Sequence, residues 1–186
     1  MDDLALETRA GLPTELRVLA DLYPRELWRG HANFGGLTAF WLDRHLMFRD
    51  LIAKLVAGTE AHLDRSDPRY ASEMSKYTGF FLNQLHHHHM IEDQHYFPQF
   101  IPLDSRLERG FEVLDRDHHA LDGHIHALAE RSNAVLQLIQ ARKDEKSAVD
   151  LLGAAQRDFS RFLHRHLEDE EDIIVPVILE YGADKE

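Results

Sequence analysis

Residues 164–176 have the sequence HRHLEDEEDIIVP, in which His166 is followed four residues later by Glu170. Successive residues of an α-helix are turned by about 100° around its axis, so residues i and i+4 lie on the same face. Residues 86–98, HHHHMIEDQHYFP, contain a second pair of this kind, His88 and Glu92. If both segments are helical, each directs an imidazole and a carboxylate into the same space.

Apolar residues recur at helical spacing along four stretches of the chain, and no alternating strand of useful length is present. Each stretch carries one histidine at a position typical of a core residue: His45, His88, His118 and His166. In the second stretch the expected stripe is Met74, Tyr77, Phe81, His88, Glu92 and His95. The aromatic residues expected in the core are Phe40, Trp41, Tyr77, Phe81, Phe111, Phe159 and Phe162. The pattern predicts an all-α fold.

Turn signals separate the four stretches. Ser66-Asp67-Pro68 offers a helix N-cap with proline at the first helical position, residues 98–105 hold two prolines and a cap, and residues 142–147 form a charged turn. Pro176 is expected to end or kink the last helix.

The same turns fix the height of the histidines. Residues at one level of an antiparallel helix pair are equidistant from the turn, and the midpoints between successive histidines fall at residues 66–67, 103 and 142, inside all three turns. We therefore predict an antiparallel up-down-up-down four-helix bundle over residues 35–181, with the four histidines at one level. Residues 1–34 are expected to form a short helical extension that packs against the bundle or a neighbour.

Composition narrows the function classes. The 186 residues include no cysteine, which excludes disulfides and thiolate metal sites, and a formal net charge of −12 argues against a nucleic-acid partner. We expect no membrane span and no secretory signal, and cytoplasmic residence as the default. The 14 histidines are several times ordinary usage, and four of them are consecutive in mid-chain.

Four imidazoles and two carboxylates exceed the four ligands of one structural zinc ion. The expected metal ligands are His45, His88, Glu92, His118, His166 and Glu170. Shared between two ions, with both glutamates bridging, they suit iron, and manganese or zinc as alternatives. An oxo or hydroxo bridge would complete the pair and leave an open position for dioxygen, peroxide or nitric oxide.

The two quoted segments resemble the metal-binding helices of the hemerythrin-like (HHE cation-binding) domains over roughly residues 35–180. The resemblance implies a four-helix bundle around a non-heme di-iron centre, with the six residues above as iron ligands. Asp122 stands where the invertebrate oxygen carriers have a further histidine, and Glu170 follows its histidine after four residues where theirs has an aspartate after five. The pattern is closer to bacterial members with four histidines and two glutamates.

Several residues and functions stay open at this stage. Whether His95, His119 or Asp122 also binds metal is open. His95 is expected behind the ligands or at the surface, and Asp122 is either an extra ligand or, the favoured alternative, a solvated helix residue. The other histidines expected behind the ligands or at the surface are His86, His87, His89, His119 and His164. The leading function is binding or sensing of dioxygen or a related small oxidant. The alternatives are a di-iron oxidase or peroxidase, in which Tyr77 and His95 could supply protons, and an iron-buffering or structural metal bundle. The oligomeric state is open, with a homodimer as one option.

Overall fold

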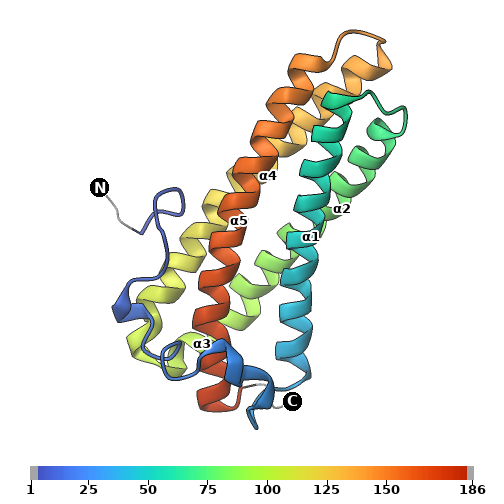
Figure 1. Cartoon of the computed structure of the whole chain (residues 1–186). Coiled ribbons are helices and arrows are strands. Elements are labelled where there is room, and N and C mark those ends of the chain that lie inside the picture. The colour runs from blue at the N-terminus through green and yellow to red at the C-terminus, as the bar shows by residue number, and fades with distance from the viewer. Residues whose placement is uncertain (1–3, 184–186) are drawn as a thin grey trace. The chain divides into compact units, whose positions relative to one another are not determined.

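The computed structural model describes residues 4–183, and in this range the chain is helical without any strand. The long helices are α1 (Gly36–Asp64), α2 (Tyr70–Ile91), α4 (Glu108–Gln140) and α5 (Lys146–Tyr181) (Figure 1). Short elements complete the chain: the 3-10 helices η1 (Thr14–Leu16), η2 (Arg25–Gly30), η4 (Ile101–Leu103) and η5 (Ser105–Leu107), the π-helical turn η3 (Glu92–Tyr96), and α3 (Phe97–Phe100). The all-α prediction is confirmed.

The three connections between the long helices lie where the turn signals predicted them, but the caps differ in detail. Pro68 lies in a turn two residues before α2, not at its first position, because Tyr70 begins that helix. Before α4 the capping residue is Asp104, whose side chain accepts a hydrogen bond from the Arg106 backbone N–H. The turn before α5 contains Arg142 at a φ of 53°.

Two local features alter the expected helices. Pro176 lies inside α5, which continues to Tyr181, so the proline does not end this helix. The π-helical turn at Glu92–Tyr96 accommodates one residue more per turn than an α-helix would, which shifts the face presented by later residues. His95 is consequently exposed, and Phe97 is buried in its place.

The chain divides into two compact units, each built from segments of the same four long helices. Unit 1 comprises residues 1–46, 89–119 and 164–186, and unit 2 comprises residues 47–88 and 120–163. No helix in the described range is both long enough and apolar enough to cross a bilayer.

The core of unit 1 includes the segment that precedes α1. Leu12, Leu16 and Leu19 of this segment are buried in one cluster with Phe97 and Ile173. Full burial of one such leucine contributes about 1.5–3 kcal/mol. The segment, blue in Figure 1, is thereby held against the C-terminal part of α5.

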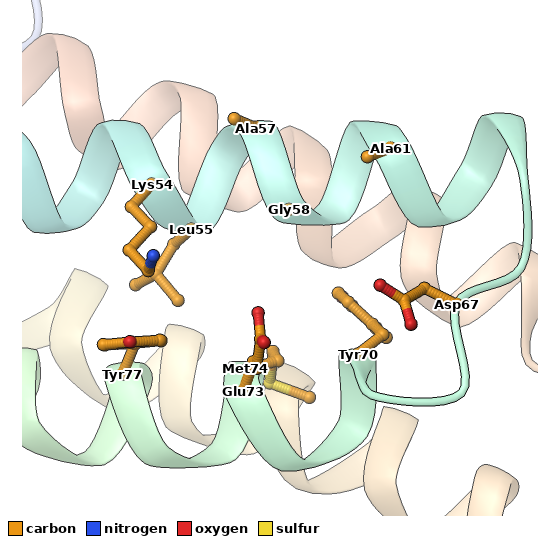
Figure 2. Close-up of a pocket in the computed structure, with 10 residues that line it drawn as sticks. All are labelled: Lys54, Leu55, Ala57, Gly58, Ala61, Asp67, Tyr70, Glu73, Met74 and Tyr77. Atoms are coloured by element: carbon orange, nitrogen blue, oxygen red, sulfur yellow. The ribbon is translucent and has the colours of Figure 1, made fainter.

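Unit 2 has an aromatic core in which Phe81 packs against Phe48 and Phe159, with ring centroids 6.4 and 5.5 Å apart. A surface pocket of about 350 Å³ between α1 and α2 is lined by Lys54 and Tyr77 among others (Figure 2). Tyr77, expected in the core, is only half-buried, and Lys54 Nζ lies 4.5 Å from its ring centroid.

Two further side chains, Phe40 and His62, have defined environments. Phe40, predicted in the core, is 60% exposed, and the Arg44 guanidinium lies 5.8 Å above its ring. His62 is buried in unit 2, where its ring stacks on Tyr70 with centroids 4.1 Å apart and its Nδ1 accepts the Asp67 backbone N–H. His62 thus joins the end of α1 to the turn that follows.

Candidate metal centre

In unit 1, three of the four predicted histidines lie close to one of two buried carboxylates, Glu92 or Glu170. His45 comes from α1, His118 from α4 and His166 from α5, and all three are buried. The Nε2 atoms of His45 and His166 lie 3.6 and 3.3 Å from Glu170 Oε2. The Nε2 atom of His118 lies 3.6 Å from Glu92 Oε2. These three histidines therefore lie close to the two buried carboxylates.

Glu92 and Glu170 are completely buried. Trp41 donates its indole N–H to Glu92 Oε1 at 2.6 Å, which orients this carboxyl group. Burial raises the pKa of Glu92, while the neighbouring His118 acts in the opposite direction. Donor atoms of His45, Glu92 and Glu170 all lie within 4.8 Å of one another, so they form one cluster.

The other ring nitrogen of each histidine is held by an acidic side chain. The Nδ1 atoms of His45, His118 and His166 lie 3.0, 2.7 and 3.3 Å from carboxylate oxygens of Glu171, Asp93 and Asp117 respectively. Because a carboxylate can only accept, Nδ1–H donates in each pair. All three rings therefore direct Nε2 toward the buried glutamates, as metal-bound histidines with outer carboxylate partners do.

The pKa values of His166 and Asp117 are both shifted by their surroundings. Burial disfavours the imidazolium, but the hydrogen bond to Asp117 and the charge of Glu170 outweigh it and raise the pKa of His166 to about 10. Burial opposes the Asp117 carboxylate, but hydrogen bonds from His166 and Arg9 hold its pKa below the ordinary value. A cation at Nε2 would take the place of the His166 proton, because only neutral imidazole binds metal.

Two arginines from the segment before α1 reach these outer carboxylates. Arg9 donates Nη2–H to Asp117 Oδ2 at 2.5 Å and Nε–H to Asp169 Oδ2 at 2.8 Å. Arg25 donates Nη1–H to Glu171 Oε2 at 2.5 Å. Neither arginine was among the functional residues expected from the sequence.

The donor set fits a cation. Nε2 of His118, Nε2 of His166 and both oxygens of Glu170 are buried and make no hydrogen bond. A buried polar atom without a hydrogen bond costs about 1–3 kcal/mol, and a buried carboxylate costs more. Imidazole nitrogens and carboxylate oxygens are ligands for iron, manganese and zinc, so a metal at this place would satisfy all four atoms.

His89, which was not among the expected metal ligands, lies beside two of them, His118 and His166. It is buried, its ring stacks on His118 with centroids 4.1 Å apart at 11°, and it meets His166 edge-on at 5.4 Å. Donor atoms of His89, His118 and His166 lie within 4.8 Å of one another. A signal existed, because Phe81, Leu85, His89 and Glu92 follow helical spacing and are all buried.

Two of the residues considered from the sequence, His88 and Asp122, belong to unit 2. His88 is the last residue of unit 2, half-buried, with its ring 5.1 Å from that of Phe48, and its role as a ligand stays a prediction. Asp122, also in unit 2, lies 3.7 Å from the exposed His86. The exposed residues among those left open from the sequence are His86, His87, His95, His119 and His164.

Comparison with known families agrees with this chemistry. Residues 36–178 match the model of the hemerythrin HHE cation-binding domain, a range that covers most of the 186 residues and includes α1, α2, α4 and most of α5. No curated protein and no solved structure matches the sequence. A metal-binding role for the buried histidine and glutamate cluster accords with that family, and the chain belongs to the hemerythrin HHE cation-binding domain family.

Proposed function

We propose that this protein holds two iron ions and binds or senses dioxygen or a related small oxidant such as peroxide or nitric oxide. The ligands in this proposal are His45, His88, Glu92, His118, His166 and Glu170, carried by an up-down-up-down four-helix bundle over residues 35–181. His89 is proposed as a seventh donor, beside His118 and His166. When bound, a pair of iron ions supplies redox activity and an open coordination position.

One observation carries the proposal. Three imidazoles turn Nδ1 outward to a carboxylate and Nε2 inward, where the nearest acidic groups are the buried Glu92 and Glu170. Two glutamates among several histidines supply more donors than one tetrahedral ion requires. Two divalent cations would also offset the carboxylate charge in a place that water does not reach.

The side chains around the cluster have identifiable tasks. Glu171, Asp93 and Asp117 fix the tautomer of the three histidines, and Trp41 holds one oxygen of Glu92. Aromatic rings exclude water from two sides. Trp41 stands edge-on to His45 with centroids 5.4 Å apart, and Phe97 stacks on His118 at 5.5 Å.

The direct test is metal analysis and absorption spectroscopy of protein purified in air. We expect about two irons per chain, near-ultraviolet bands of bridged ferric ions, and a spectral change when the reduced protein meets dioxygen, peroxide or nitric oxide. His166→Ala should lose most of the metal, whereas His164→Ala, an exposed neighbour on α5, should retain it. Wild-type protein with well under two metal ions, or loaded protein that responds to none of the three oxidants, contradicts the proposal.

A further inference from the structure

The segment before α1 carries a buried arginine whose position apolar packing does not explain. Arg9 is only 6% exposed, and its guanidinium is enclosed by acceptors on three sides. Besides the bonds to Asp117 and Asp169, its Nη1–H donates to the Leu4 carbonyl at 2.7 Å. Leucines already attach this segment to the core, and a buried ion pair is seldom more stable than apolar residues of the same volume. Arg9 therefore suggests a task other than attachment.

Arg25 repeats the arrangement at a second histidine. Its Nη1–H donates to Glu171 Oε2, while Nη2–H donates to Asp172 Oδ1 at 2.7 Å and to the Glu168 carbonyl at 3.1 Å. The guanidinium carbon lies 4.9 Å from the Trp28 ring centroid, which holds the side chain from the other side. Four contacts thus fix the direction of Arg25.

Each of the two arginines is linked through one carboxylate to one predicted metal-binding histidine. Arg9 binds Asp117, which accepts Nδ1–H of His166. Arg25 binds Glu171, which accepts Nδ1–H of His45. Both histidines direct Nε2 to the same oxygen, Glu170 Oε2. Two points of the N-terminal segment, 16 residues apart in sequence (25 minus 9), therefore converge on a single glutamate of the metal centre.

We propose that Arg9 and Arg25 are positioning residues of the metal centre, each holding the carboxylate that orients one histidine on either side of Glu170. The inference rests on the proposed function, since it takes His45 and His166 as ligands. Outer carboxylates fix the ring orientation and basicity of bound histidines, and their loss typically lowers metal affinity roughly 10–100-fold. An arginine in a fixed bidentate or two-acceptor contact determines where such a carboxylate stands.

Arg9 and Arg25 both lie outside residues 36–178, the part that matches the family model. The N-terminal segment is in this proposal a component of the metal site that the chain adds to the shared domain. Residues 1–34 and the bundle over residues 35–181 then act as one functional unit.

The test compares full-length Arg9→Met, Arg9→Lys, Arg25→Met and Arg17→Met. Arg17 is the control, because it lies in the same segment and pairs with Asp21 and with Asp172, a carboxylate that it shares with Arg25, but not with Asp117 or Glu171. Metal affinity is measured by competition with a chelator, and the ligand field by the absorption spectrum of the loaded protein. Melting of the metal-free proteins reports the fold separately.

We expect Arg9→Met and Arg25→Met to lower metal affinity roughly 10–100-fold and to shift the absorption bands. Arg9→Lys should recover part of the affinity, and Arg17→Met should match wild type. The Arg25 side chain is 44% exposed, so Arg25→Met keeps the core intact and decides the matter if Arg9→Met fails to fold.

Failure of this inference differs from failure of the proposed function. Wild-type protein that binds no metal contradicts the proposed function. Wild-type protein that binds metal, with folded Arg9→Met and Arg25→Met variants of unchanged affinity and spectrum, contradicts only the role of the two arginines. An Arg17→Met variant as impaired as Arg25→Met would also contradict it, because the effect would then belong to the segment's surface charge.

Discussion

The two nitrogens of each buried histidine have separate environments. On His166, Nδ1 faces Asp117 while Nε2 faces Glu170, and His45 and His118 repeat this division with other partners. Acidic residues near a histidine are common in any acidic chain, but an outer acceptor and an inner buried carboxylate on one ring impose a direction. That direction turns three core histidines into a convergent donor set.

Substitution of His89 tests whether its imidazole binds metal in addition to those of the predicted ligands. Because its buried ring contacts both His118 and His166, we expect His89→Leu to lower metal affinity and change the absorption spectrum of the loaded protein. His87→Leu is the control, since His87 is exposed two positions earlier on the same helix. Identical affinity and spectra for the two variants would show that His89 only fills the core.

Substitution of Trp41 tests how much its hydrogen bond to Glu92 stabilises the protein. Trp41→Phe removes the donor to a fully buried carboxyl oxygen, so we expect the free energy of unfolding of the metal-free protein to fall by about 1–3 kcal/mol. Trp28→Phe removes a bond to the partly buried Tyr23 carbonyl, which water can replace, and should cost less. Denaturant titration of both variants measures the difference, and equal losses would contradict it.

At the scale of the elements, the π-helical turn after α2 decides which side chains reach the centre. It begins at Glu92 and leaves Phe97, not His95, buried against His118. The α-helical period alone places His95 on the same inner stripe as Glu92. His95 is nevertheless exposed, at the surface, one of the two places expected for it from the sequence. No residue type marks a π-helical turn in a sequence. Such a turn forms where the packing of the residues that follow compensates for its less favourable backbone geometry.

The contact of α4 with α5 gives a prediction about glycines. A Cβ at Gly110 would lie 3.0 Å from Ile173 Cδ1, whereas nothing lies within 4 Å of a Cβ at Gly123. Gly123→Ala should stabilise α4 by about 0.5–1 kcal/mol, because alanine loses less entropy in a helix. Gly110→Ala should destabilise the protein by about 1–2 kcal/mol, because overpacking outweighs that gain.

Thermal unfolding of the two alanine variants in the metal-free state measures this difference. A Gly110→Ala variant more stable than wild type would show that Ile173 changes rotamer at little cost. In that case the absence of a side chain at Gly110 would not be required for the packing of α4 against α5 in unit 1.

At the scale of the whole molecule, the centre joins distant parts of the chain. Donors come from α1, the end of α2 with η3, α4 and α5, and the supporting arginines come from the first 25 residues. The protein also has a formal net charge of −12, so cations bound inside it reduce repulsion among its acidic groups. Metal binding is therefore expected to stabilise the fold.

Removal of the metal should lower the melting temperature. A ligand that binds only the native state stabilises it by about 2.7 kcal/mol per site at a free concentration 100 times the dissociation constant. For a chain of this size each kcal/mol is worth roughly 2–4 °C. With two such sites we expect chelator-treated protein to melt roughly 10–20 °C lower. The shift should be smaller for Glu170→Gln, and calorimetry that finds equal melting temperatures contradicts a metal site.

The sequence by itself determined the helical fold, the positions of the three turns, and the buried histidines and glutamates with donor chemistry. These follow from local periodicity and from residue type, which the chain carries at every position. The tertiary structure alone decided that His89 contacts both His118 and His166, and that Arg9 and Arg25 hold the carboxylates behind His166 and His45. The arginine contacts join residues more than 100 positions apart, and the His89 contacts join α2 to α4 and α5, so no local pattern encodes these pairings.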